Sequence, residues 1–111
     1  MGGWYAAPPL ATRAGFSRRF EGVFGRPPPR LATLAYDATA LAAGLARAQG
    51  GPDFGVRALT QPSGFAGIDG IFRFRADGVV QRGLAILQIR RHGAEVIRPA
   101  PRFFDTGPTI N

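Results

Sequence analysis

The chain has 111 residues and a mass of 11.8 kDa, which is enough for one small domain. Hydrophobic residues make up 45% of the chain, a share typical of globular proteins. The sequence has no cysteine and one histidine, which excludes disulfides, thiol nucleophiles, cysteine-based zinc sites and a histidine-rich metal site.

The charge is strongly basic, with 14 basic against 7 acidic residues and a formal net charge of +7. All the basic residues are arginine, and the densest groups are the pairs Arg18-Arg19 and Arg90-Arg91. An excess of this kind fits an anionic partner such as nucleic acid, acidic lipid or a cell-wall polymer. It also fits the arginine bias of a GC-rich genome. We favour the compositional interpretation, because the arginines are scattered and form no long run.

The first third of the chain predicts a short strand and a helix. Residues 3–7 suit a strand that Pro8-Pro9 would stop. A helix is predicted over Leu10–Phe24, ended by Gly25 in a left-handed conformation. Its apolar stripe has helical spacing and consists of Phe16, Phe20, Val23 and Phe24.

A second helix is predicted over Leu31–Ala48, with a wide apolar face of mostly small residues. Gly50-Gly51-Pro52 would end it, and Asp53 would cap a short third helix reaching about Thr60. Apolar helix faces of this width normally cover a parallel sheet, which this chain does not encode. The chain is therefore expected to be the end of something larger, or half of an assembly.

From Phe65 onward, apolar and polar residues alternate with the two-residue period of a strand rather than the spacing of a helix. We predict strands over 70–75, over 79–89 and over 95–97, separated by turns at Asp77-Gly78 and His92-Gly93. The predicted fold class is α/β: one short strand and two to three helices, followed by a three-stranded antiparallel meander. The organisation that follows is a strand-helix-helix segment over 1–62, a crossover and meander over 63–102, and a loose tail over 103–111.

The order of several motifs resembles the C-terminal third of type I periplasmic binding proteins. The match spans roughly residues 3–100 and is carried by Phe16-x3-Phe20-x3-Phe24-Gly25-x-x-Pro28, Ala35-Tyr36-Asp37-Ala38, Phe65-x-Gly67-x-x-Gly70-x-Phe72-x-Phe74, Asp77-Gly78 and a strand ending in Gly93. The subgroup resembled is that of leucine/isoleucine/valine-binding-like substrate-binding proteins of ABC transporters and penicillin-binding-protein activators. Most of that family's length, including its main ligand loops, has no counterpart here.

The resemblance implies a non-enzymatic solute-binding module, in which two α/β lobes close on a ligand around a hinge with three crossings. The ligand would be a small polar molecule such as an amino acid, bound only together with the missing lobes. An ABC permease or a cell-wall synthase would be the partner, and the full protein would be periplasmic. The resemblance also implies that this chain crosses between lobes near Gly64–Gly70. No cofactor or metal is expected.

Three aromatic residues are candidates for the rim of the ligand cleft. Trp4 and Tyr5 lie at a strand end, where open α/β sheets bind ligands, and Tyr36 lies near the start of a helix. Each could instead be a core residue. Asp37 is explained by the dipole of its helix, and Asp69 is interpreted as a loop carboxylate. His92 is interpreted as a solvated turn residue without a catalytic partner, so no enzymatic activity is expected.

Two alternatives from other functional classes stay open. A stand-alone chain could self-associate as a homodimer through exposed strand edges, as a structural or interaction protein. A small basic nucleic-acid binder is the other, but Phe72 and Phe74 alternate with Arg73 and Arg75 and so lie on the opposite face of the strand. No apolar window is long enough to span a membrane. The N-terminus lacks the pattern of a signal peptide, so either the protein is cytosolic or its export signal lies on sequence outside this chain.

Overall fold

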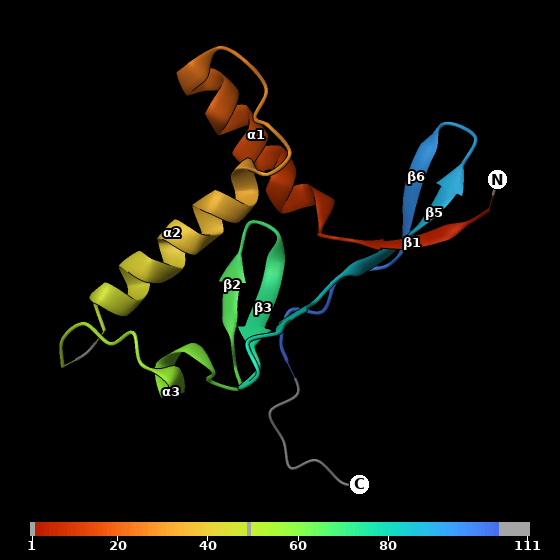
Figure 1. Cartoon of the computed structure of the whole chain (residues 1–111). Helices are drawn as coiled ribbons and strands as arrows, with labels where there is room; N and C mark the ends of the chain where they lie inside the picture. The colour runs from red at the N-terminus through yellow and green to blue at the C-terminus, as the bar shows by residue number, and fades with distance from the viewer. Residues whose placement is uncertain (1, 49, 105–111) are drawn as a thin grey trace, which may run out of the picture.

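The computed structural model describes residues 2–48 and 50–104, which form two halves joined at a narrow waist (Figure 1). One half contains all the described helices and a small sheet, and the other is a second small sheet that extends away from it. The helices are α1 (Leu10–Phe24), α2 (Ala32–Ala46) and α3 (Val56–Leu59). The strands are β1 (Trp4–Ala7), β2 (Phe65–Gly67), β3 (Gly70–Phe74), β4 (Val80–Arg82), β5 (Ala85–Arg90) and β6 (Gly93–Arg98).

Helices α1 and α2 pack through aromatic side chains. The Phe16 ring of α1 meets the Tyr36 ring of α2 edge-on at 5.3 Å, and within α1 the Phe20 and Phe24 rings lie 4.5 Å apart. Gly25 follows α1 with φ of 71°, a left-handed conformation that glycine adopts without steric cost, so the chain can turn away from the helix. The predicted bounds of α1 are therefore confirmed.

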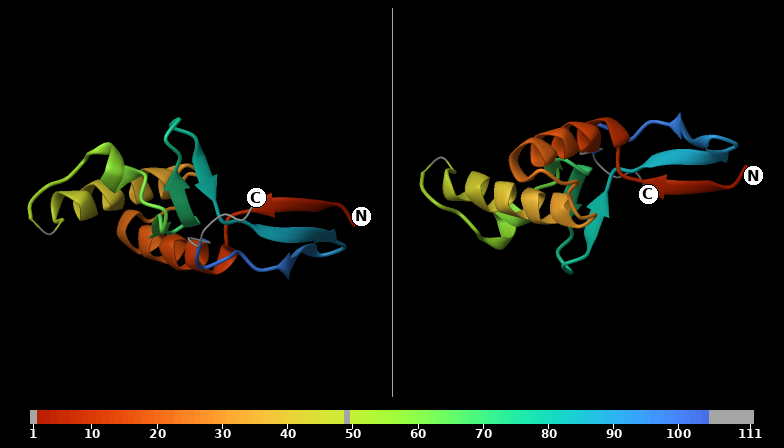
Figure 2. Two further views of the ribbon diagram at one scale, coloured as in Figure 1. Left: turned by 90° about the horizontal axis from the view of Figure 1, so that it is seen from below. Right: turned by 90° about the horizontal axis from the view of Figure 1, so that it is seen from above.

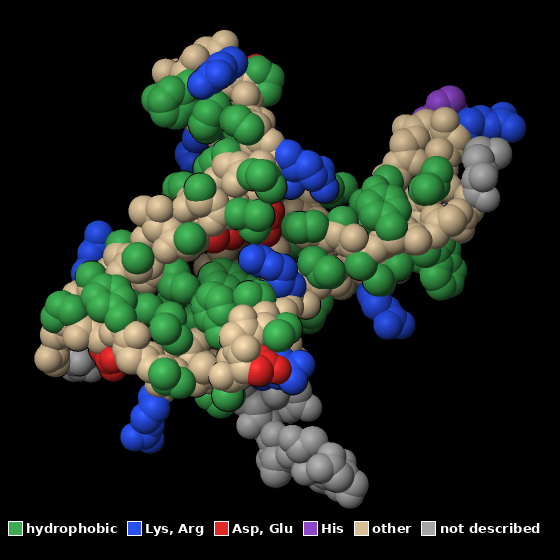
Figure 3. All heavy atoms as spheres, in the orientation of Figure 1, with side chains coloured by type: hydrophobic (Ala, Val, Ile, Leu, Met, Phe, Trp, Pro, Cys, Tyr) green, Lys and Arg blue, Asp and Glu red, His purple; other side chains and the backbone are tan. Residues whose placement is uncertain are grey.

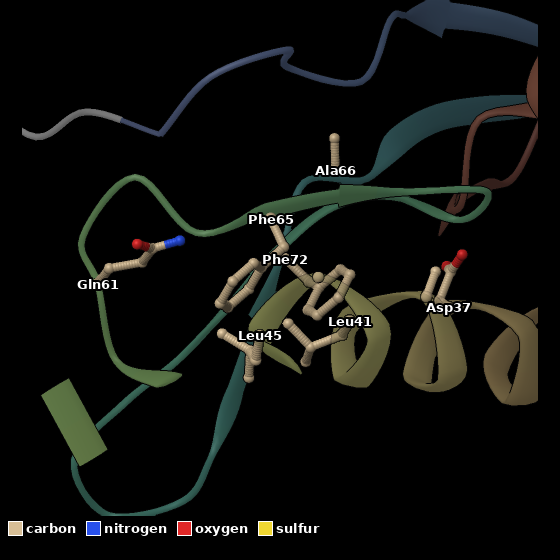
Figure 4. Close-up of a pocket in the computed structure, with 9 residues that line it drawn as sticks. Asp37, Leu41, Leu45, Gln61, Phe65, Ala66 and Phe72 are labelled. Carbon is tan, nitrogen blue, oxygen red and sulfur yellow. The ribbon is translucent and has the colours of Figure 1, made fainter. Parts of the chain in front are cut away.

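A sheet of β2, β3 and β4 covers one side of α2. All three strands are antiparallel, and β2 and β3 form a hairpin in which Gly67 pairs with Gly70. Phe65 and Phe72 lie on the face turned toward Leu41 and Leu45 of α2 (Figure 4). The alternation predicted for β3 is confirmed at Phe72, which is buried, while Arg73 lies on the other face and donates to Gln81.

The second sheet has the strand order β1-β5-β6, also fully antiparallel. The N-terminal strand β1 pairs with β5 in a register that places Tyr5 opposite Leu87. Leu87 and Ala85 of β5 are buried, whereas every residue of β6 is exposed. This sheet therefore has a buried centre and an uncovered edge.

Several sequence predictions are corrected at this point. The mixed α/β character is confirmed, but the single meander is wrong, because the strands after Phe65 divide between two sheets. Gly83 interrupts the long strand predicted over 79–89 and separates β4 from β5. Asp53 does not cap α3, because the N-cap of α3 is Gly55. The Asp53 carboxylate instead accepts a local hydrogen bond from the Gly55 N–H. Most of the predicted tail, from residue 105 onward, lies outside the described residues.

The molecule is flat and open, with extents of 51 × 46 × 20 Å (Figure 2). Its radius of gyration is 16.3 Å, whereas a compact domain of this length has about 13 Å. The buried apolar residues are few: Phe16, Ile71, Phe72, Ala85 and Leu87. Large apolar side chains on the helices and on the edge strands β1 and β6 are consequently left uncovered.

Candidate functional site: the waist and the buried carboxylates

Three separate chain segments meet at the waist between the two halves. Residues 8–9 connect β1 to α1, residues 83–84 connect β4 to β5, and residues 99–101 return from β6. A Cβ placed on Gly70 would lie 3.0 Å from Pro9 Cδ and 3.1 Å from the Gly83 carbonyl oxygen. A Cβ placed on Gly83 would lie 2.9 Å from Pro101 Cγ. The three segments therefore lie close together around Gly70 and Gly83.

The residues at the waist suit a narrow crossing. Prolines lack an N–H donor and have a restricted φ, so they pass between elements without joining a sheet. Gly83 leaves room for Ile71 and Pro101, and its N–H donates to the Ile71 carbonyl at 2.9 Å. A hollow of about 530 Å³ lies beside the crossing and is lined by Pro9, Thr12, Gly70, Ile71 and Pro101 among others. The expected crossing near Gly64–Gly70 is wrong, because Gly67 and Gly70 lie in the β2–β3 hairpin within one half.

A buried carboxylate fastens this hairpin to α2. Asp37 is 5% exposed, and its two oxygens accept hydrogen bonds from the backbone N–H groups of Ile68 at 2.7 Å and Asp69 at 3.2 Å. Gly67 is required here by space, because a Cβ would lie 2.5 Å from the Asp37 Cγ. The side chain thus satisfies two turn donors that the sheet leaves without a ladder partner.

A second buried carboxylate lies in the same turn. Asp69 is 3% exposed, and its Oδ2 accepts a hydrogen bond of 2.8 Å from the Thr33 hydroxyl. Thr33 and Asp37 are four residues apart and therefore share one face of α2. The other oxygen, Oδ1, has no hydrogen-bond partner, and the Arg13 guanidinium of α1 lies 4.0 Å from it. Arg13 offsets the charge, and the cluster links α1, α2 and the hairpin next to the waist.

A pocket of about 330 Å³ lies between α2 and the β2–β3 hairpin (Figure 4). The side chains of Leu41, Leu45, Phe65 and Phe72 approach one another at its centre. Asp37 lies at one end and Gln61 at the other, where the Gln61 amide donates to the Gly64 carbonyl at 3.1 Å. Both Asp37 oxygens and the Gln61 amide nitrogen are hydrogen-bonded within the protein, and apolar side chains line the centre of the pocket.

The hydrogen bonds of the two carboxylates fix the backbone of the β2–β3 turn against α2. Both Asp37 oxygens are committed to turn N–H groups, and the hydroxyl that adjoins Asp69, that of Thr33, is itself only 2% exposed. Within residues 2–48 and 50–104, no cluster of histidine and acidic residues could hold a metal ion. In the same part of the chain, no helix is both long and apolar enough to cross a membrane.

The structure distributes the three candidate rim residues over both halves. Trp4 is 69% exposed and Tyr5 is also exposed, and they lie on opposite faces of β1. Tyr36 is exposed on α2, where its ring contacts Phe16, so it is partly a packing residue. The structure does not bring Tyr36 together with Trp4 and Tyr5. His92 is exposed in the turn between β5 and β6, as predicted.

Sequence reasoning missed the roles of Asp37, Thr33, Asp69 and Arg13. Asp37 had been explained by its helix dipole, yet its partners are on a hairpin. The available signal was an acidic residue on the apolar side of a helix together with two glycines that bracket a turn. Comparisons of the chain with protein families, with curated proteins and with solved structures found no match.

Proposed function

We propose that this chain is the C-terminal portion of a two-lobed, non-enzymatic solute-binding module of the type I periplasmic class. It would belong to a substrate-binding protein of an amino-acid ABC transporter or to a penicillin-binding-protein activator, in the periplasm. Its ligand would be a small polar molecule such as an amino acid, held jointly with the remainder of both lobes. A permease or a cell-wall synthase would be the partner.

The observation that carries this proposal is the waist. Three segments cross between the halves side by side, and they contain Pro9, Gly83 and Pro101. Hinge motions are absorbed by a few residues at element ends, and three narrow crossings permit bending without breaking either sheet.

The uncovered surface supports an incomplete lobe. The chain exposes 8199 Å², whereas a compact monomer of this mass exposes about 5,900 Å². On α2, one side meets the hairpin and another meets α1. The third side presents Leu34, Ala38 and Ala42, all exposed and mostly small, a face that suits close contact with a sheet. The remainder of the lobe would cover this face.

The test is ligand-induced stabilisation of the complete product. The reading frame upstream of Met1 would be read first, and the longest product expressed and melted with each common amino acid. A ligand that binds only the folded state raises Tm by mass action, so one or a few amino acids should raise it. The chain by itself should show no shift. An upstream frame that closes at once, or a complete product that no amino acid stabilises, would contradict the proposal.

Self-association is the second candidate, and the free strand edges favour it. β1 and β6 are both edge strands, and β6 is exposed along its whole length. Unpaired edges are templates for pairing with another chain. A closed upstream frame together with a stable dimer in light scattering would move this candidate to first place.

A further inference from the structure

The segment that follows β6 returns across the waist to the helical half (Figure 1). We call this segment, residues 99–104, the strap. Pro101 of the strap packs beside Gly83, because a Cβ placed on that glycine would lie 2.9 Å from Pro101 Cγ. Residues 99–102 also line the hollow of about 530 Å³ beside the crossing. The strap therefore continues past the crossing and forms part of the surface of the helical half.

The strap reaches a socket formed by Arg73 and Gly64. The Arg73 guanidinium lies over the Phe104 ring, 4.5 Å from the ring centroid, which is the geometry of a cation–π contact. A Cβ placed on Gly64 would lie 3.0 Å from Phe104 Cε2, so the ring lies against the backbone at this glycine. Phe104 is half-buried, whereas its neighbour Phe103 is 85% exposed. Phe104 is therefore the residue that attaches the strap to the sheet of β2, β3 and β4.

Arg73 is positioned for this contact by hydrogen bonds that do not involve the strap. Its Nε donates to the Gln81 side chain on β4 at 2.7 Å, and its Nη1 donates to the Pro62 carbonyl at 2.9 Å. Two bonds from one planar guanidinium fix the plane of the group, so its face is already oriented toward an aromatic ring. A side chain that is already ordered loses little further entropy on contact. The socket is therefore preorganised for Phe104.

The place of this attachment affects how the two halves can move. Strands β1, β5 and β6 lie side by side in that order, so their three crossings form a row at one end of the second sheet. Figure 3 shows this sheet projecting beyond the row as an arm. Arg73 lies two residues along β3 from Ile71, the residue that meets Gly83 at the crossing. Phe104 is thus attached away from the row, and a tether attached off a hinge axis resists rotation about that axis.

We propose that the strap is a conformational clasp of the waist. With Phe104 seated under Arg73, the two halves are held at the angle seen in the structure. With Phe104 released, the waist bends about the row of crossings, because a few residues at element ends can absorb such a motion. The inference concerns contacts within this chain, and it therefore does not depend on the proposed solute-binding function.

The experiment measures the distance between the halves by double electron–electron resonance of two spin labels on the whole chain. Because the sequence has no cysteine, the labels can be attached at Ala42→Cys on α2 and at Arg91→Cys at the far end of the second sheet, both exposed positions. Three changes are then made in this labelled pair. Phe104→Ala removes the ring, Phe104→Tyr keeps it, and Phe103→Ala is the matched control on the exposed neighbour. Circular dichroism establishes that each variant is folded.

The unchanged strap, Phe104→Tyr and Phe103→Ala should each give the same narrow distance distribution. Phe104→Ala should broaden it and raise the population outside the main distance about tenfold, the effect of losing about 1.4 kcal/mol. Arg73→Met removes the cation and should broaden the distribution in the same way. Indistinguishable distributions for Phe104→Ala and Phe103→Ala overturn the proposal. If Phe104→Ala does not fold, a folded Arg73→Met with the narrow distribution overturns it instead.

Discussion

The Asp37 carboxylate on α2 accepts a 2.7 Å hydrogen bond from the backbone N–H of Ile68 in the β2–β3 turn. This bond joins two elements that share no sequence-local contact, and it is buried beside the waist. A carboxylate forms stronger hydrogen bonds with backbone N–H groups than a neutral acceptor does. Two such bonds fix both the distance and the orientation of the turn relative to the carboxylate. Together with the Thr33–Asp69 bond, the Asp37 side chain therefore fixes the orientation of the hairpin relative to α2.

Replacing Asp37 with Asn should destabilise the chain by about 2 kcal/mol, because one acceptor becomes an amide donor that faces a buried backbone N–H. The free energy of unfolding in urea measures this. Asp53→Asn is the control, since Asp53 is exposed and accepts only a local bond. If both variants unfold at the same urea concentration, Asp37 does not hold the hairpin.

Replacing Gly67 with Ala should also destabilise the chain, by about 1–3 kcal/mol, the usual cost of forced overpacking. The added Cβ would overlap the Asp37 carboxyl, whose Cγ lies 2.5 Å from that position. Gly22→Ala on the exposed side of α1 is the matched variant, because nothing lies within 4 Å of its Cβ. It should stabilise the chain by about 0.5–1 kcal/mol. Thermal melts of the pair should shift in opposite directions, and a shared direction would refute the packing argument.

Replacing Thr33 with Val removes the hydroxyl that donates to Asp69 Oδ2 and leaves the shape of the side chain nearly unchanged. The cost should be about 1–3 kcal/mol, because the buried carboxylate loses its donor while Oδ1 already lacks one. The same substitution at Thr39, an exposed residue on the same helix, should change stability by less than about 0.5 kcal/mol. Equal costs at the two positions would mean that the Thr33–Asp69 bond contributes nothing.

The elements that sequence predicted well are those with local signals. Helix α1 begins after Pro8-Pro9 and ends at Gly25, and its stripe around Phe16 and Phe20 packs as helical spacing requires. The Asp77-Gly78 turn formed as predicted, with the Asp77 carboxylate accepting from the Val79 N–H. Each of these depends on residues a few positions apart, so a single sequence carries enough information.

Strand pairing and the buried carboxylates depend on residues far apart. The apolar run in β5 indicates a strand but does not say that its neighbour is β1, at the other end of the chain. Gly83 lies between Arg82 and an apolar run, and its role as a crossing appears only once Ile71 and Pro101 surround it. Asp37 could be explained by its own helix, which concealed its partners in the hairpin.

The single tryptophan reports whether the second sheet is covered. Trp4 is 69% exposed on β1, so acrylamide should quench its fluorescence almost as strongly in the folded chain as in urea. In a complete two-lobed protein, the same residue should be protected, because the rest of the lobe would cover this sheet. Quenching is measured at several protein concentrations. Protection of Trp4 in the chain alone that disappears on dilution would show instead that a second copy covers the sheet, and would favour self-association over solute binding.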